Sequence, residues 1–159
     1  MMNSMMNPID LATNSVNNNY ATHWDVTILA YGFLWVCHIE HMDPTTMLAL
    51  TVLDKKAGSF KLRGRCKDAK VNANKMYEIA SMFGHCEKIC SREHYLNICK
   101  WAKETHKRNA GETAEQLVRD FYGLEMYWYK DSTPGKVAGD MIVNGVHIQH
   151  KHQNATFAH

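Results

Sequence analysis

The stretch Gly-Asp-Met-Ile-Val-Asn-Gly-Val-His-Ile-Gln-His-Lys at residues 139–151 decides the fold. Two short runs of alternating apolar residues flank Asn144-Gly145, and a two-residue Asn-Gly loop favours a type I′ turn because both residues tolerate positive φ. The stretch therefore predicts a β-hairpin. Counting outward from the turn, the register pairs Asp140 with Gln149 across the two strands.

The alternation gives this hairpin two faces. The apolar face carries Met141, Val143, Val146 and Ile148, and the other face carries Asp140, Ile142, His147, Gln149 and Lys151. Directly opposed Cβ atoms lie roughly 4.5–5.5 Å apart, so a carboxylate and an amide carbonyl there are able to share one hard cation. A lysine beside them would orient a water or stabilise a developing negative charge. The structural alternative is the solvated side of a half-buried hairpin.

An Asp, a hairpin and then Gln149-His150-Lys151, preceded by an acidic helix, resembles the core of the PD-(D/E)XK nuclease superfamily. The likeness is to the Q-x-K variant of Mrr-type restriction endonucleases, and it covers residues 111–157. It implies a DNA endonuclease with Asp140 and Gln149 as ligands of Mg²⁺, or of Mn²⁺ in its place. In the same likeness, Lys151 positions the attacking water or stabilises the phosphate, and Glu115 contributes a further acid from the preceding helix.

The end of the chain bears on this resemblance, because such nucleases continue into another helix and strand after the lysine. We expect that the chain is an incomplete version of a longer protein, that a partner subunit such as a second copy supplies the missing layer, or that an N-terminal segment completes the sheet. The helix of residues 114–122 is the nearest element able to cover the apolar face of the hairpin. With one face covered, the hairpin is expected to be labile.

The whole pattern predicts an α+β fold with a β-rich N-terminal part, central helices and a C-terminal helix-strand-hairpin unit that resembles part of a restriction-endonuclease-like core. Residues 1–20 are rich in Asn and Met and are interpreted as a mobile leader. Residues 21–110 are predicted to form a β-hairpin and helical region that could contact DNA, and residues 111–159 the partial core that the resemblance to nucleases implies.

Individual elements follow from local signals. Residues 26–37 are predicted as a buried strand, with a helix as the alternative that their periodicity also allows, and residues 47–53 and 59–65 as a hairpin. Residues 74–83 have helical spacing, and Ser91 is expected to cap a helix that runs to about residue 107. A third helix is predicted to begin at Thr113, with Gln116 completing a capping box.

A basic stripe accompanies the predicted second hairpin. Eight Lys or Arg residues lie between positions 55 and 75, against the single acid Asp68. The candidates for DNA contact are Lys55, Lys56, Lys61, Arg63 and Arg65. Lysines on an edge strand also serve solubility, which is the structural alternative. A non-catalytic DNA-binding or regulatory protein is therefore the second functional hypothesis.

Cysteine usage indicates the compartment. The chain has five cysteines and no cleavable signal segment, which favours a reducing, cytoplasmic setting. The longest apolar run has 14 residues, too short for a membrane span. If residues 86–94 were one helix, Cys86, Cys90 and His94 would share a face and could bind zinc, with Cys66 or His38 as a fourth ligand. Buried core cysteines are the default interpretation.

Overall fold

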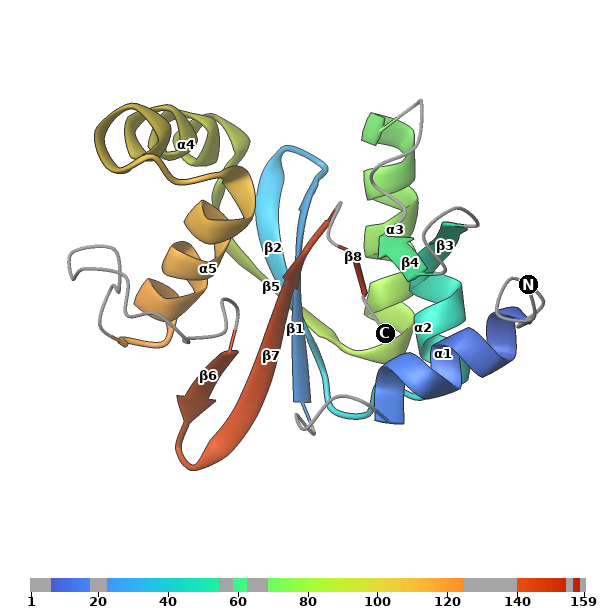
Figure 1. Cartoon of the computed structure of the whole chain (residues 1–159). Coiled ribbons are helices and arrows are strands. Elements are labelled where there is room, and N and C mark those ends of the chain that lie inside the picture. The colour runs from blue at the N-terminus through green and yellow to red at the C-terminus, as the bar shows by residue number, and fades with distance from the viewer. Residues whose placement is uncertain are drawn as a thin grey trace.

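A computed structural model describes residues 7–17, 23–54, 59–62, 69–124, 140–153 and 156–157. The chain has an α+β fold, as predicted, in which a curled sheet lies between two groups of helices (Figure 1). The sheet has five strands in the order β5-β2-β1-β7-β6. Their bounds are β1 His23–Ala30, β2 Phe33–Ile39, β5 His85–Ser91, β6 Asp140–Val143 and β7 Val146–His152.

The C-terminal hairpin is joined to the N-terminal part of the chain through β1. Strand β7 pairs with β6 on one side and with β1 on the other, and the β1–β7 pairing is parallel. An N-terminal segment therefore completes the sheet beside the hairpin, which confirms one of the three expected arrangements. Strand β7 of the hairpin thus has a paired strand on each side.

The helices cover both faces of the sheet (Figure 1). One layer contains α4 (Arg92–His106) and α5 (Ala110–Phe121), and the other contains α1 (Pro8–Asn17), α2 (Pro44–Leu50) and α3 (Ala69–Phe83). A small sheet lies beside the second layer, with β3 (Thr51–Asp54), β4 (Ser59–Leu62) and β8 (Thr156–Phe157) in the order β3-β4-β8. Helices of the same chain therefore cover the described part of the hairpin, and no partner subunit is needed for this.

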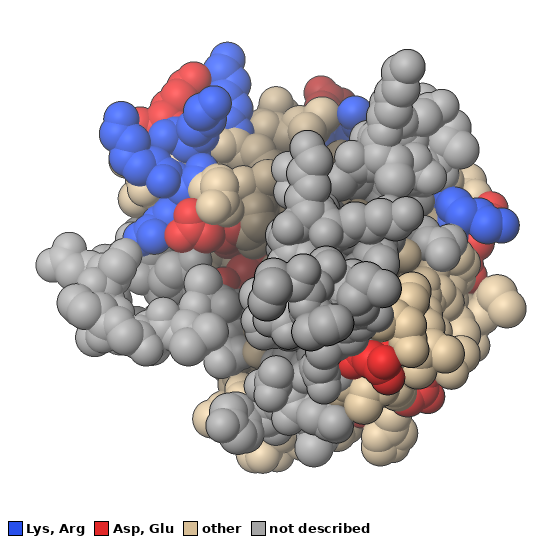
Figure 2. Space-filling model, turned by 45° about the vertical axis from the view of Figure 1, so that its right-hand side comes forward, with Lys and Arg blue, Asp and Glu red and all other residues tan. Residues whose placement is uncertain are grey.

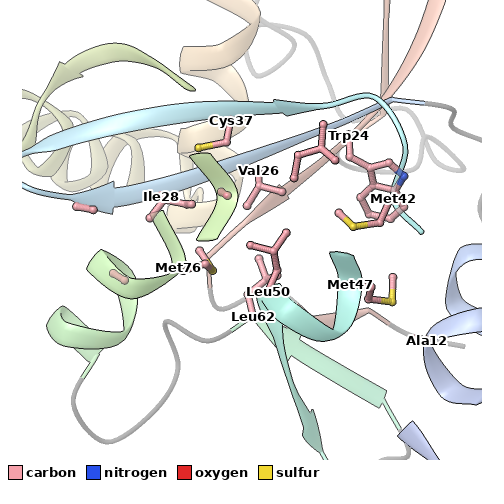
Figure 3. Packing of buried hydrophobic residues seen from close by; sticks show 14 residues of the cluster. Ala12, Trp24, Val26, Ile28, Cys37, Met42, Met47, Leu50, Leu62 and Met76 are labelled. Carbon is pink, nitrogen blue, oxygen red and sulfur yellow. The ribbon is translucent and has the colours of Figure 1, made fainter. Parts of the chain in front are cut away.

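The larger core lies between the sheet and the second layer. Strand β1 alternates, so Trp24, Val26 and Ile28 point into this core while Asp25 and Thr27 point to the opposite face. Figure 3 shows the β1 side chains packed against side chains from α2, α3 and β4. The labelled members of this cluster are Ala12, Trp24, Val26, Ile28, Cys37, Met42, Met47, Leu50, Leu62 and Met76.

The opposite face of the sheet packs on α4 and α5. Val118 of α5 lies in one buried cluster with Val36, Met141 and Ile148. Val143, Val146 and Tyr122 pack against the same cluster. The predicted apolar face of the hairpin thus packs on α5, the helix that was predicted to cover it.

Four predictions about local structure are wrong. The apolar run of residues 26–37 is two strands, because the chain turns at Tyr31-Gly32 with φ of 50° and 81°. Residues 44–50 form a helix before β3 begins, because Asp43 accepts a hydrogen bond from Thr46 N and Pro44 suits the first helical position. Helix α5 begins at Ala110, with Asn109 and Glu112 forming its capping box. The leader of residues 1–20 contains α1, whose Ala12 is buried in the core.

Among the described helices, none has the length and hydropathy that crossing a bilayer requires.

Candidate functional site

The β6–β7 hairpin has the predicted turn and register. Asn144 and Gly145 have φ values of 50° and 78°, as a type I′ turn requires. The pairing joins Asp140 with Gln149 and Met141 with Ile148, in the register counted from the sequence. The positions of the proposed metal ligands are therefore directly opposed in the sheet.

Gln149 and Lys151 point to the sheet face opposite α5. In the parallel register Gln149 lies beside Trp24 and Lys151 beside Val26, and paired residues of neighbouring strands share a face. Gln149 is 7% exposed, and Lys151 is partly buried. The side chain of Asp140 lies outside the described part of the structure. The structure therefore gives the opposed backbone positions of Asp140 and Gln149 and the burial of the Gln149 amide.

Glu115 lies apart from these residues. It is buried on α5 and forms an ion pair with Arg119 at 3.3 Å. Helix α5 covers the face that carries Ile148, whereas Gln149 and Lys151 lie on the opposite face. The structure therefore does not bring Glu115 together with the Gln149–Lys151 pair.

The predicted DNA-contacting residues lie largely outside the described residues. This holds for Lys55, Lys56, Arg63 and Arg65. Lys61 lies on β4, and the expected pairing of β3 with β4 is present. The side chain of Lys61 is not described, so the predicted basic stripe stays a prediction.

The helix on which the zinc alternative depends does not form, because residues 85–91 are strand β5. A register shift against β2 next to Cys90 turns the strand. Cys86 packs in the cluster on the α3 side, and Cys90 packs in the cluster on the α4 side. The two sulfurs thus lie on opposite faces of the sheet. No group of three metal-binding side chains occurs among the residues described.

The structure contains a polar network that sequence reasoning did not find. His38 Nδ1 lies 2.8 Å from Asp25 Oδ1, and His38 Nε2 lies 2.7 Å from Glu87 Oε2. The Tyr122 hydroxyl donates to Asp25 Oδ2 and lies 3.0 Å from His38 Nδ1. These four residues come from β1, β2, β5 and the C-terminal end of α5. No local spacing in the sequence links them.

The charges of this network favour an imidazolium. Burial lowers the pKa of His38, but the hydrogen bonds and charges of Asp25 and Glu87 outweigh it and raise the pKa. Burial, followed by the hydrogen bond to Asp25, raises the pKa of Tyr122. The two carboxylates thus favour the protonated form of His38, and the hydrogen bond from Tyr122 to Asp25 ties the end of α5 to the sheet.

A surface pocket of about 400 Å³ adjoins His38. Its wall contains residues from the end of β2, the start of α2, the end of α3 and the start of β5. The lining residues are His38, Glu40, His41, Asp43, Thr46, Phe83, Gly84 and His85. The imidazole of His85 stacks on that of His38 at a centroid distance of 6.2 Å.

A second polar chain is buried beneath α4 and α5. Thr27 Oγ1 lies 2.9 Å from His150 Nε2 and 2.7 Å from His152 Nδ1. The Tyr95 hydroxyl lies 3.1 Å from His152 Nε2 and donates to the carbonyl of Ala110. Burial lowers the pKa of His150 to about 3 and that of His152 to about 4. Both imidazoles are therefore neutral at neutral pH.

Comparison with known proteins adds no relative: no protein-family model matches the chain, and neither a curated protein nor a solved structure matches it.

Proposed function

We propose that this protein is a metal-dependent DNA endonuclease that hydrolyses phosphodiester bonds at the β6–β7 hairpin. The pairing of Asp140 with Gln149, with Lys151 two residues further along the same strand face, is the observation that carries the proposal. The order of acid, hairpin and Gln-x-Lys resembles that of PD-(D/E)XK nucleases. Strand β1 supports the likeness, because it extends the sheet beside the strand that bears Gln149 and Lys151.

The donor set suits magnesium. A carboxylate and an amide carbonyl are hard oxygen ligands, and Mg²⁺ in nucleotide-processing sites takes one or two protein carboxylates and fills its other positions with water and phosphate. Asp140 and Gln149 would hold the ion, with Mn²⁺ as a substitute. A bound ion would lower the pKa of a coordinated water and neutralise charge on the phosphate.

The protein groups have separate roles in this proposal. The strand pairs on both sides of β7 fix the backbone at Gln149, and the side chain is buried, so it would need little ordering when a ligand arrives. Lys151 is less buried and would stabilise negative charge on the phosphate or orient the attacking water. Glu115 has no role, since its carboxylate pairs with Arg119 on the other side of the sheet.

Nicking of supercoiled plasmid DNA in Mg²⁺ or Mn²⁺ tests the proposal. We expect Asp140→Ala and Lys151→Ala to lose nicking while binding of a labelled duplex is retained. Ile142→Ala is the matched control, because Ile142 is 68% exposed on the same hairpin face and has no polar group. Equal nicking by Asp140→Ala and wild type, or DNA binding without nicking in either metal, would contradict the proposal.

A non-catalytic DNA-binding protein is the second candidate, and one feature of α4 favours it. Arg92, Lys100 and Lys103 lie on one side of α4, Lys107 caps the C-terminal end of the helix, and all four are exposed. Figure 2 shows Lys and Arg side chains gathered at the upper left of the molecule, where α4 lies in Figure 1. Such a stripe would neutralise phosphates without reading sequence.

Salt dependence separates the two candidates. If α4 carries the contact, Lys100→Glu combined with Lys103→Glu weakens duplex binding and flattens its dependence on salt. Glu93→Lys and Glu104→Lys on the same helix are matched controls and would strengthen binding. Strong binding through α4 with no metal-dependent nicking would favour the binding protein.

A further inference from the structure

Two cysteines face each other across the edge of the main sheet. Cys37 on β2 and Cys86 on the edge strand β5 are direct cross-strand partners. Both pack in the core on the α3 side, where Cys37 is fully buried and Cys86 is partly exposed. Their sulfurs are hydrogen-bonded to each other. The thiols are therefore already in contact, and one of them is accessible from solvent.

The spacing suits a disulfide that is easily reduced. Opposed residues of antiparallel strands have Cα atoms about 4.5–5.5 Å apart, inside the range of disulfides. Their Cβ atoms lie roughly 4.5–5.5 Å apart, slightly more than a relaxed disulfide has. Bond closure must draw the strands together, and among the described residues no strand pairs with β5 on its outer side to oppose this. A strained disulfide has a higher reduction potential and is reversible.

We propose that Cys37 and Cys86 form a hydroperoxide-sensitive dithiol that closes reversibly to a disulfide between β2 and β5. Cys86 is the attacking sulfur. The hydrogen bond from Cys37 lowers the pKa of Cys86 against the effect of burial, and the nearby His38 adds to the lowering. Donating that hydrogen bond, followed by burial, raises the pKa of Cys37, which keeps its proton.

The reaction balances with hydrogen peroxide as the oxidant. The Cys86 thiolate attacks one peroxide oxygen, the O–O bond breaks, and the leaving oxygen takes a proton and departs as water. The Cys37 sulfur then attacks the sulfenic sulfur of Cys86, the S–O bond breaks, and the proton of Cys37 leaves with hydroxide as a second water. Two thiols are oxidised by two electrons in total, and one peroxide is reduced to two waters.

The disulfide would fix the edge of the sheet. The closed loop of about 50 residues would contain α2, β3, β4 and α3, and such a cross-link limits the freedom of the enclosed segment. His38 and His85 follow and precede the two cysteines in sequence, and both line the surface pocket. Oxidation would thus restrict the movement of β2 and β5 where they form the wall of this pocket.

Peptide mapping of the full chain tests the proposal. The reduced protein is treated with hydrogen peroxide, quenched with iodoacetamide, digested and analysed by mass spectrometry. We expect a Cys37–Cys86 cross-linked peptide that disappears with dithiothreitol. Iodoacetamide alone should label Cys86 of the native reduced protein faster than Cys90, because the pKa of Cys86 is lowered and more of its thiol is present as thiolate. Burial raises the pKa of Cys90.

Variants separate the two sulfurs. In Cys37→Ser, the sulfenic acid of Cys86 should persist and react with dimedone, whereas Cys86→Ser should give no cross-link. Cys90→Ala is the matched control and should cross-link as wild type does. Circular dichroism checks that each variant is folded, and the labelling rates of the wild-type protein need no variant. A cross-link between other cysteines, or oxidation of Cys90 before Cys86, would overturn the proposal.

Discussion

Mild acid should destabilise this protein through its two buried histidines. The folded-state pKa values of His150 and His152 are about 3 and 4, below the value of 6.5 for an unperturbed histidine. Lowering the pH from 7 to 5 protonates both residues in the unfolded chain and neither in the folded chain. Burial disfavours the charged form of both imidazoles, and the charges of His152, Lys151 and Arg119 also oppose protonation of His150.

The sign and size follow from proton linkage. Because the folded chain binds fewer protons, stability is fully present above pH 6.5 and is lost as the pH falls toward the folded-state pKa values. At pH 5 each histidine lowers the free energy of unfolding by about 2 kcal/mol, so the two together lower it by about 4 kcal/mol. His38 offsets part of this loss as the pH falls. Its raised pKa contributes stability that is present below pH 6.5 and is lost as the pH rises through the folded-state value.

Urea unfolding at several pH values between 5 and 7 measures the effect. Near pH 5.5 we expect the free energy of unfolding to change by about 2.5 kcal/mol per pH unit. His150→Gln keeps a hydrogen-bonding group near Thr27 and should reduce this slope to about half. His94→Gln, at an exposed position on α4, is the matched control. A free energy of unfolding that is flat from pH 7 to pH 5, or an unchanged slope in His150→Gln, would refute the reasoning.

Three further predictions concern stability and are tested by thermal or urea unfolding. Ile148→Ala should lower the free energy of unfolding by about 2–4 kcal/mol, since Ile148 is buried against α5. Ile142→Ala, at a 68% exposed position, should change it by less than about 0.5 kcal/mol. Equal effects would contradict the register of the hairpin. Gly84→Ala should lower the free energy of unfolding by at least about 2 kcal/mol, because its Cβ would meet the backbone oxygen of His38 at 2.2 Å. Gly111→Ala near the start of α5 should be neutral or slightly stabilising. An unchanged stability of Gly84→Ala would show that the backbone relaxes at this position. Ser91→Ala should cost about 1 kcal/mol because Ser91 Oγ accepts the backbone N–H of His94, and no loss would mean that water replaces the cap.

Local chemistry made part of the fold predictable. Asn144-Gly145 specifies a turn with positive φ at both residues, and the register then follows by counting. Ser91 precedes a run of helical spacing and caps α4 as expected. These signals depend on residues that are adjacent in sequence, so a single chain suffices to find them.

Other elements were missed because two interpretations of the same residues competed. Asp43-Pro44 is a typical breaker of a strand, but it is also an N-cap followed by proline at the first helical position, and the helix is what forms. The turn at Tyr31-Gly32 places a tyrosine at positive φ, which aromatic residues rarely adopt. The sequence therefore offered no reason to divide the apolar run into β1 and β2.

The candidate sites divide in the same way. The opposition of Asp140 and Gln149 was predictable because both lie within a few residues of one turn. The Asp25–His38–Glu87–Tyr122 network was not, since its members are brought together by the antiparallel pairing of β1, β2 and β5 and by the packing of the end of α5. Glu115 satisfied a sequence order but lies on a helix that covers the other face of the sheet.

The central claim is that Asp140 and Gln149 hold one metal ion, and a double-mutant cycle on Mn²⁺-dependent plasmid nicking tests it most directly. Rates are measured for wild type, Asp140→Asn, Gln149→Ala and the double variant across a range of Mn²⁺ concentrations. We predict that each single variant slows nicking and raises the Mn²⁺ concentration needed. Because both residues act through one ion, the double variant should be little slower than Asp140→Asn alone. Multiplying effects of the two substitutions, or nicking that does not depend on the metal, would contradict the account.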